Sequence, residues 1–95
     1  MSHQDKLFDF RKADGSRNFA DVPWLPPLVL RQKLDAKEGV RITAFIEGFT
    51  EAWIDFDYRG HSFSVHNPVG EYWLIVRDPT CPDEILSEVT KLVTS

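Results

Sequence analysis

Apolar and polar residues alternate almost without interruption between Ala52 and Asp78. A period of two is typical of a β-strand that buries one face and exposes the other to water. The alternation reverses at Arg59-Gly60, and a two-residue turn there predicts a hairpin of residues 52–58 and 61–66. Pairing Tyr58 with His61 puts the apolar sets of both strands on the same face, as a stable hairpin requires.

Turn-forming residues on both sides of this hairpin extend the predicted sheet. The segment 67–70, Asn-Pro-Val-Gly, predicts a loop to a further strand that ends near Arg77. The segment 47–49, Glu-Gly-Phe, predicts a three-residue loop from an earlier strand. These loops would set His66 beside Glu71 and Ile42 beside Ile54, so the pattern predicts an antiparallel meander of four strands.

Residues 28–34, Leu-Val-Leu-Arg-Gln-Lys-Leu, fit two structures. On a strand, the three leucines line up and the two basic side chains take the other side, which would add a fifth strand. We favour this interpretation. On a helix, the apolar residues scatter around the axis, but Pro26-Pro27 would suit a helix start and Gly39 would suit its end.

Residues 81–93 predict a C-terminal helix, because apolar residues recur there at helical spacing. The segment Thr80-Cys81-Pro82-Asp83 has the spacing of a capping box. Residues 1–27 are too apolar for a free tail, and a turn signal at 13–16 indicates a short hairpin or an irregular wrap. We therefore expect one α+β domain over residues 1–95, with an antiparallel meander of four to five strands at 28–77 and the C-terminal helix packed on one face.

Two tryptophans fall on the polar phase of the alternation. The predicted outer face of the sheet gathers Phe45, Trp53, Asp55, Ser64, His66, Glu71 and Trp73. Aromatic side chains within a polar rim are typical of a protein-recognition patch, and Trp is a frequent anchor there. Two alternatives remain: residues 1–27 fold over this face and bury the tryptophans as a second small core, or the face holds a small molecule.

Charge and composition restrict the classes of partner that we expect. A formal net charge of −4 without a basic patch argues against nucleic acid, and the acidic residues would favour a basic patch on a protein partner. No apolar run approaches the roughly 20 residues of a membrane span. The first residues lack the apolar core of a signal peptide, and a single cysteine forms no internal disulfide. We expect a cytoplasmic protein that does not bind membranes.

The outer face contains the residue types of a hydrolytic triad and of a metal site, but the positions of these residues along the strands disfavour both. Asp55, Ser64 and His66 are the residue types of a hydrolytic triad, but Ser64 and His66 lie about 6.5–7 Å apart along one strand with parallel side chains. We therefore assign no catalytic residue. His61 and His66 are an odd number of residues apart and point to opposite faces, so we expect neither a metal site nor a cofactor.

An enzyme remains as the alternative class. Cys81 would lie at a helix N-terminus, where the thiolate is stabilised, and Tyr58, His61 and Tyr72 would line the rim of a pocket beneath the helix. Our main hypothesis is a small non-enzymatic protein-binding or regulatory module. It would work through the Trp53 and Trp73 face, with a protein partner or a second copy of itself.

Overall fold

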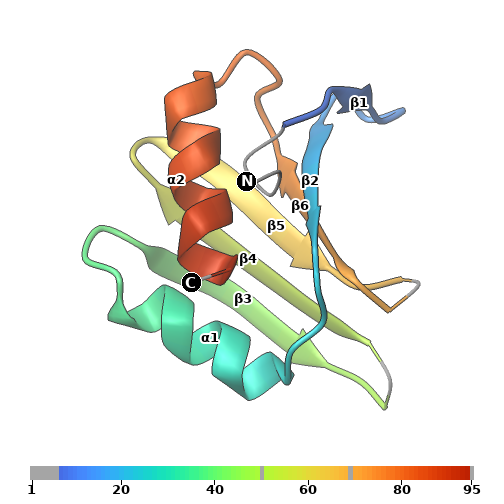
Figure 1. Ribbon diagram of the computed structural model, residues 1–95, viewed down its shortest axis with the longest axis vertical. Helices are drawn as coiled ribbons and strands as arrows, with labels where there is room; N and C mark the ends of the chain where they lie inside the picture. Colours follow the sequence, from blue (N-terminus) through green and yellow to red (C-terminus); the bar gives the residue numbers. More distant parts are fainter. Residues whose placement is uncertain (1–6, 50, 69, 95) are drawn as a thin grey trace, which may run out of the picture.

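A computed structural model describes residues 7–49, 51–68 and 70–94 of the chain. The described residues form one antiparallel sheet of six strands in the order β1-β2-β6-β5-β4-β3, together with two helices (Figure 1). The strands are β1 (Phe10–Arg11), β2 (Arg17–Val22), β3 (Arg41–Glu47), β4 (Ala52–Tyr58), β5 (His61–His66) and β6 (Tyr72–Val76), and the helices are α1 (Pro27–Ala36) and α2 (Asp83–Thr94). The predicted α+β class with an antiparallel sheet and a C-terminal helix is confirmed, although the sheet has six strands and not four to five.

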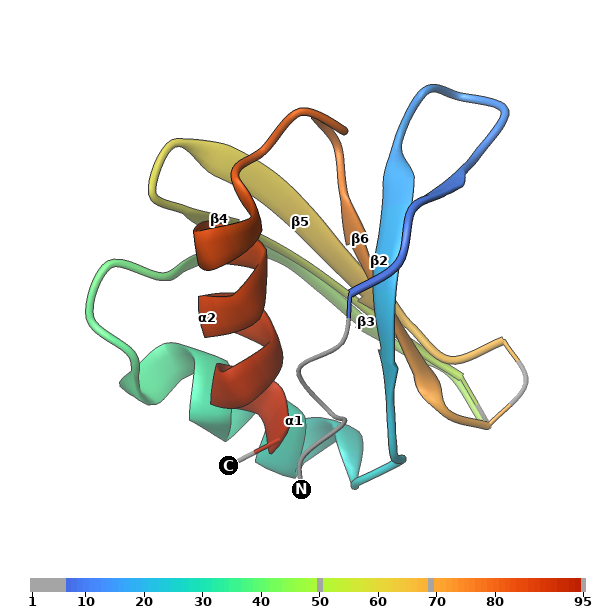
Figure 2. The same ribbon diagram turned by 45° about the horizontal axis from the view of Figure 1, so that its top comes forward.

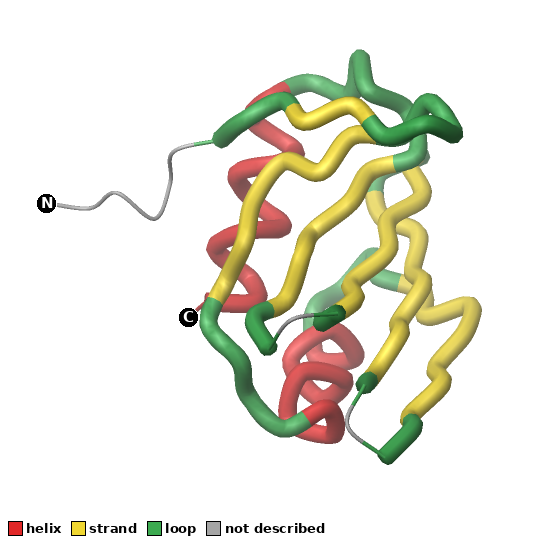
Figure 3. The backbone as a smooth tube through the Cα atoms, turned by 90° about the vertical axis from the view of Figure 1, so that its right-hand side faces the viewer, coloured by secondary structure: helices red, strands yellow, loops and turns green. Residues whose placement is uncertain are grey.

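Both helices lie on the same side of the sheet (Figures 1 and 2). We call the sheet face toward them the inner face and the opposite one the outer face, against which no helix of the described residues packs (Figure 3). Side chains of the inner face and of both helices form the core. Its fully buried members include Leu30, Leu34, Ile54, Phe56, Val65, Tyr72, Leu74, Val76, Leu86 and Val89. Phe56 stacks on Phe63 with 5.3 Å between the ring centroids.

The β4–β5 hairpin has the predicted register. Tyr58 pairs with His61 and Phe56 with Phe63. Arg59 and Gly60 both have positive φ, 52° and 80°, as the two central residues of a type I′ turn require. Along β4 every second residue is buried, so the alternation seen in the sequence corresponds to the two faces of the sheet.

The prediction of a strand at 28–34 is wrong, because this segment lies within helix α1. Pro27 stands in the first turn of the helix, where its missing N–H costs nothing. Leu30 and Leu34 are four residues apart and fully buried, whereas Leu28 is 57% exposed. A buried pair at i, i+4 is compatible with the period of a strand and with that of a helix. The segment is helical because Leu30 and Leu34 pack into the core on the inner face beside β3. The meander therefore begins at β3 and not at residue 28.

Within the described part of the N-terminal segment, from residue 7 on, β1 and β2 extend the sheet and do not fold over the outer face. β1 and β2 form a hairpin whose turn lies at 13–16, as the turn signal indicated, and β2 pairs with β6. Asp14 stabilises this turn, since its Oδ1 accepts hydrogen bonds from the Ser16 N–H at 3.0 Å and from the Ser16 hydroxyl at 2.6 Å. The tryptophans of the outer face are therefore not covered by β1 or β2.

A β-bulge in β3 corrects the predicted register of the first hairpin. Ile42 pairs with Phe56 and Ala44 with Asp55, so Thr43 is an extra residue without an opposite partner. The bulge moves all later residues of β3 to the other face. Phe45, which we expected on the outer face, pairs with Ile54 and packs against the core from the inner face.

The β5–β6 pairing differs from the predicted one by two residues. His66 lies opposite Trp73 and not opposite Glu71. A shift of two leaves every side chain on its predicted face, because the side-chain period of a strand is two. The predicted loop at 67–70 includes Val69, which lies outside the described residues.

Helix α2 begins at Asp83, two residues later than predicted. The predicted capping box is replaced by a turn around Asp78, whose Oδ1 accepts hydrogen bonds from the backbone N–H and the hydroxyl of Thr80. No helix in the described ranges is long and apolar enough to cross a membrane.

Candidate functional site

Three aromatic side chains form one row across the outer face. Trp53 of β4 and Trp73 of β6 both lie directly opposite His66 of the central strand β5. The Trp53 and His66 rings are 4.5 Å apart between centroids. All three side chains are half-buried, and we call them the aromatic row. The row continues to Ile46 on β3, which is 64% exposed, and to the exposed Asp21 on β2.

Carboxylates border the aromatic row. We call Asp21, Glu51, Asp55 and Glu71 the acidic rim. Glu51 Oε1 lies 3.8 Å from His66 Nε2, an ion pair whenever the imidazole is protonated. Partial burial, and to a smaller extent the charge of Glu71, raise the pKa of Asp21 above its ordinary value.

A cation of the chain itself already contacts the row. The ammonium of Lys12, which follows β1, lies 5.6 Å from the centroid of the Trp73 ring. This distance is within the range of a cation–π interaction, in which the negative face of the indole attracts positive charge. Trp73 thus presents a ring face to cations.

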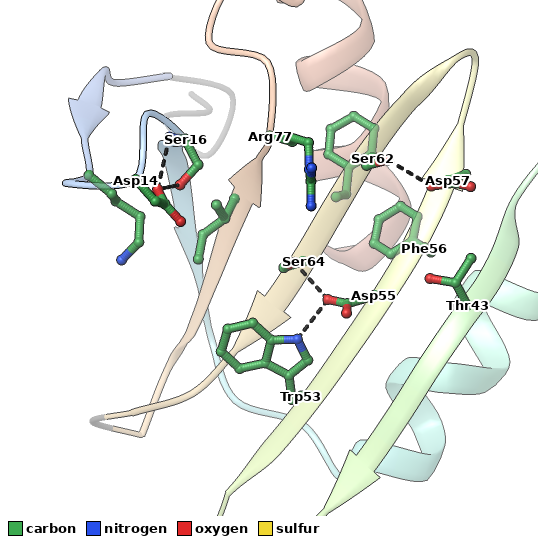
Figure 4. A pocket seen from close by; sticks show the side chains of 13 residues that line it. Asp14, Ser16, Thr43, Trp53, Asp55, Phe56, Asp57, Ser62, Ser64 and Arg77 are labelled. Carbon is green, nitrogen blue, oxygen red and sulfur yellow. Dashed lines mark hydrogen bonds between the residues drawn. The ribbon is translucent and has the colours of Figure 1, made fainter.

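A hollow of about 490 Å³ lies beside the aromatic row on the same face (Figure 4). Its walls come from the β1–β2 turn and from β3, β4, β5 and β6. Asp55 Oδ1 accepts hydrogen bonds from the Trp53 indole N–H at 2.6 Å and from the Ser64 hydroxyl at 2.7 Å. Asp57 Oδ1 accepts one from the Ser62 hydroxyl at 2.9 Å. These bonds hold both carboxylates in place and leave the second oxygen of each without a partner among the described residues.

The charges that line the hollow are mixed. Asp14, Asp55 and Asp57 oppose Lys12 and Arg77. The guanidinium of Arg77 points into the hollow in Figure 4, and it makes no ion pair with any residue that the structure describes. Polar, hydrogen-bonding groups therefore surround a space that is open to solvent.

The geometry does not assemble a catalytic triad. Ser64 donates its hydroxyl proton to Asp55, whereas His66 lies among Trp53, Trp73 and Glu51. A nucleophile needs a base within about 3 Å, and Ser64 has a carboxylate hydrogen bond in place of an imidazole one. Within the described ranges, no group of three or more His, Cys, Asp or Glu side chains has the arrangement of a metal site.

Cys81 has the opposite environment to that expected of a reactive thiol. The side chain is 3% exposed, and burial, with a smaller effect of the Asp78 charge, raises the pKa of the thiol to about 11. Because only the thiolate is nucleophilic, a thiol with this pKa reacts slowly near neutral pH.

The expected rim of Tyr58, His61 and Tyr72 does not form. Tyr58 and His61 flank the β4–β5 turn, whereas Tyr72 begins β6 at the other end of the sheet. The Tyr58 hydroxyl donates to Glu88 of α2 at 2.9 Å, and the Tyr72 hydroxyl donates to the Leu25 carbonyl oxygen at 2.8 Å. Both hydroxyls fix core elements to each other, so no shared pocket connects the three side chains.

The structure brings most of the predicted outer-face residues together. Trp53, Asp55, Ser64, His66 and Trp73 share the outer face, Glu71 lies just before β6, and Phe45 lies on the inner face. Sequence reasoning missed Lys12, Asp21 and Ile46. The run Ala44-Phe45-Ile46 holds three apolar residues in succession, which breaks the alternation and was the available signal for the bulge.

Comparisons with protein-family models, curated proteins and solved structures found no match for this chain.

Proposed function

We propose that this chain is a non-enzymatic binding module that recognises a basic segment of a partner protein on the outer face. The observation that carries the proposal is the aromatic row, three half-buried rings side by side on a sheet face that neither helix covers. Aromatic residues that stay accessible contribute large contact areas at low entropic cost, and they dominate the binding free energy of many interfaces.

The charge of the face selects the partner. Four carboxylates form the acidic rim, whereas the cations on this face near them include the Lys12 ammonium over Trp73 and the Arg77 guanidinium in the adjoining hollow. A basic partner would compensate this charge and would associate faster at low ionic strength.

The experiment is an NMR titration of the isotope-labelled full chain with short basic peptides and with acidic peptides of matched length. Basic peptides are expected to shift the indole N–H signals of Trp53 and Trp73, and acidic peptides are not. Trp73→Ala should weaken binding about tenfold or more, as expected for an aromatic anchor.

Trp24→Ala is the matched control. Trp24 is 54% exposed and lines a different cleft with Val22, Leu25 and Val93, and this cleft shares only Asp21 with the aromatic row and its acidic rim. An equal loss of affinity in both variants, or shifts that avoid the aromatic row, would refute the proposal. Light scattering of the isolated chain tests whether the partner is a second copy.

A second candidate function rests on the hollow itself. The unpaired Arg77 guanidinium and the open oxygens of Asp55 and Asp57 suit a small neutral ligand that both donates and accepts hydrogen bonds. The mixed charges disfavour a simple anion or cation. Titration with neutral sugars should then shift the signals of Ser62 and Ser64, and Arg77→Ala should remove those shifts; unchanged spectra at millimolar sugar would exclude this function.

A further inference from the structure

We infer that the segment recognised by the aromatic row is proline-rich and adopts the polyproline II conformation, with two prolines three residues apart on Trp53 and Trp73. A lysine or arginine two or three residues from a proline would contact the acidic rim. The inference rests on the proposed function and specifies its partner.

The spacing of the two indoles carries the inference. Trp53 and Trp73 lie opposite the same residue, His66, and are therefore separated by two strand spacings. Neighbouring strands are about 4.8 Å apart, which puts the backbone positions of the two tryptophans about 9.6 Å apart across the sheet. A polyproline II chain advances about 3.1 Å per residue with three residues per turn, so equivalent positions recur every 9.3 Å or so.

Other backbone conformations fit this spacing less well. Residues on the same side of an extended strand recur about every 6.7 Å, and the next repeat comes at about 13 Å. A helix offers the pair i, i+7 at about 10.5 Å, but its diameter of about 10 Å requires a wider groove than a single row of side chains. Polyproline II recognition, in contrast, typically uses exposed aromatic side chains as its platform.

The hydrogen bonds of the two tryptophans complement such a chain. The Trp53 indole N–H is donated to Asp55, which holds the ring in place. The Trp73 side chain has a cation–π contact with Lys12 and makes no hydrogen bond with another described residue, so its indole N–H is available to donate. A polyproline II backbone has no internal hydrogen bonds, and its carbonyl oxygens are available as acceptors.

A basic side chain of the partner segment has two possible contacts on the outer face, the Asp55 carboxylate and the Trp73 ring. Asp55 lies two residues along β4 from Trp53, about 7 Å away, within reach of an arginine or lysine. The Trp73 ring already contacts the Lys12 ammonium, so a partner cation could replace it. Both contacts follow from charges and ring faces that the chain presents without rearrangement of the sheet.

The test compares four blocked peptides on the full chain by NMR titration. The reference is Arg-Ala-Pro-Ala-Ala-Pro-Ala-Ala-Arg, with prolines three apart. Its matched control, Arg-Ala-Pro-Ala-Ala-Ala-Pro-Ala-Arg, has the same composition and charge with prolines four apart. The third peptide replaces both prolines of the reference by alanine, and the fourth replaces both arginines by glutamate.

The reference peptide is expected to bind about tenfold more tightly than each of the others, a difference in free energy of about 1.4 kcal/mol. Equal binding of the three arginine peptides would overturn the inference and leave the proposed function standing. Absence of binding by all three arginine peptides would overturn both. Equal binding of the glutamate peptide would overturn the charge requirement of both proposals.

Variants of the aromatic row provide a second test. Its readout is the ratio of two peptide affinities measured on the same variant, and this ratio is unaffected if the substitution also lowers the stability of the fold. The ratio of affinities for the reference and the proline-shifted peptide should fall to about one in Trp53→Ala and Trp73→Ala, because one anchor then remains. Trp73→Phe should retain part of the preference, and Trp24→Ala all of it. A ratio that persists in both alanine variants would show that the two indoles do not measure the proline spacing.

Discussion

The two faces of strands β4, β5 and β6 share one backbone but have opposite environments. On the inner face Ile54, Phe56 and Leu74 are buried to 1% exposure or less. On the outer face Trp53, His66 and Trp73 pair in the same ladders but keep part of their rings in solvent. The difference arises because α1 and α2 supply apolar side chains to one face only (Figures 1 and 3). Aromatic residues therefore stabilise the fold on one face and form an accessible surface on the other.

The largest effect should come from the inner face. Phe56→Ala removes a fully buried ring that stacks on Phe63. We expect a loss of about 3–5 kcal/mol in the free energy of unfolding, a large part of the stability of a small domain. Urea unfolding followed by circular dichroism measures this. A loss below about 1 kcal/mol would contradict the assignment of this face as the core.

The matched change on the outer face should cost much less stability. Trp73→Ala removes a larger ring, but one that is only half-buried and contacts cross-strand neighbours. We expect a loss of about 1 kcal/mol in the free energy of unfolding. If Trp73→Ala destabilises the chain as strongly as Phe56→Ala, the aromatic row belongs to a second core and not to a binding surface.

The substitution Lys12→Ala tests how the charge of the outer face affects its affinity for basic peptides. The substitution removes the ammonium that lies over Trp73 and leaves the acidic rim with less compensating charge. We expect a basic peptide to bind a few-fold more tightly, since an exposed cation–π contact contributes about 0.5–1 kcal/mol. Fluorescence titration at low and high salt measures the change. A weaker affinity would mean that Lys12 takes part in recognition.

The smallest effect concerns the acidic rim and its pH dependence. The pKa of Asp21 is raised in the folded chain, so its ionisation destabilises the fold; this penalty is absent below the unfolded pKa of about 3.9 and fully present above the folded pKa. Asp21→Asn should therefore increase stability by no more than about 0.5 kcal/mol near neutral pH, because the group is largely exposed. The gain should disappear as the pH falls below the unfolded pKa of about 3.9, where the carboxyl is protonated in both the folded and the unfolded chain. Thermal unfolding across pH measures it, and a gain that grows toward acid pH would contradict the sign.

Local signals in the sequence were sufficient for the central hairpin. Arg59-Gly60 permits two positive φ angles, and this turn sets the register of β4 against β5. The outer-face positions of Trp53 and His66 follow from that register. Trp73 was placed on the correct face although its partner was wrong, because an error of two residues preserves the face.

Local signals were insufficient where two periods fit the same residues. The leucines of residues 28–34 match a strand and a helix, and packing of Leu30 and Leu34 on the inner face decided between them. The bulge at Thr43 depends on how β3 fits both β4 and α1, and it carried Phe45 to the inner face. The pairing of β2 with β6 joins residues fifty or more positions apart, for which no turn sets the register.

The sequence by itself determined the alternation of the meander, the turn between β4 and β5, and which face carries the two tryptophans. These features depend on neighbouring residues, whose backbone preferences and side-chain period act over a few positions. Only the tertiary structure decided that His66 stands between the two indoles, that Lys12 reaches Trp73, and that neither α1 nor α2 packs on the outer face. Those features depend on which distant segments compete for the same apolar surface, and that competition is settled by packing of the whole chain.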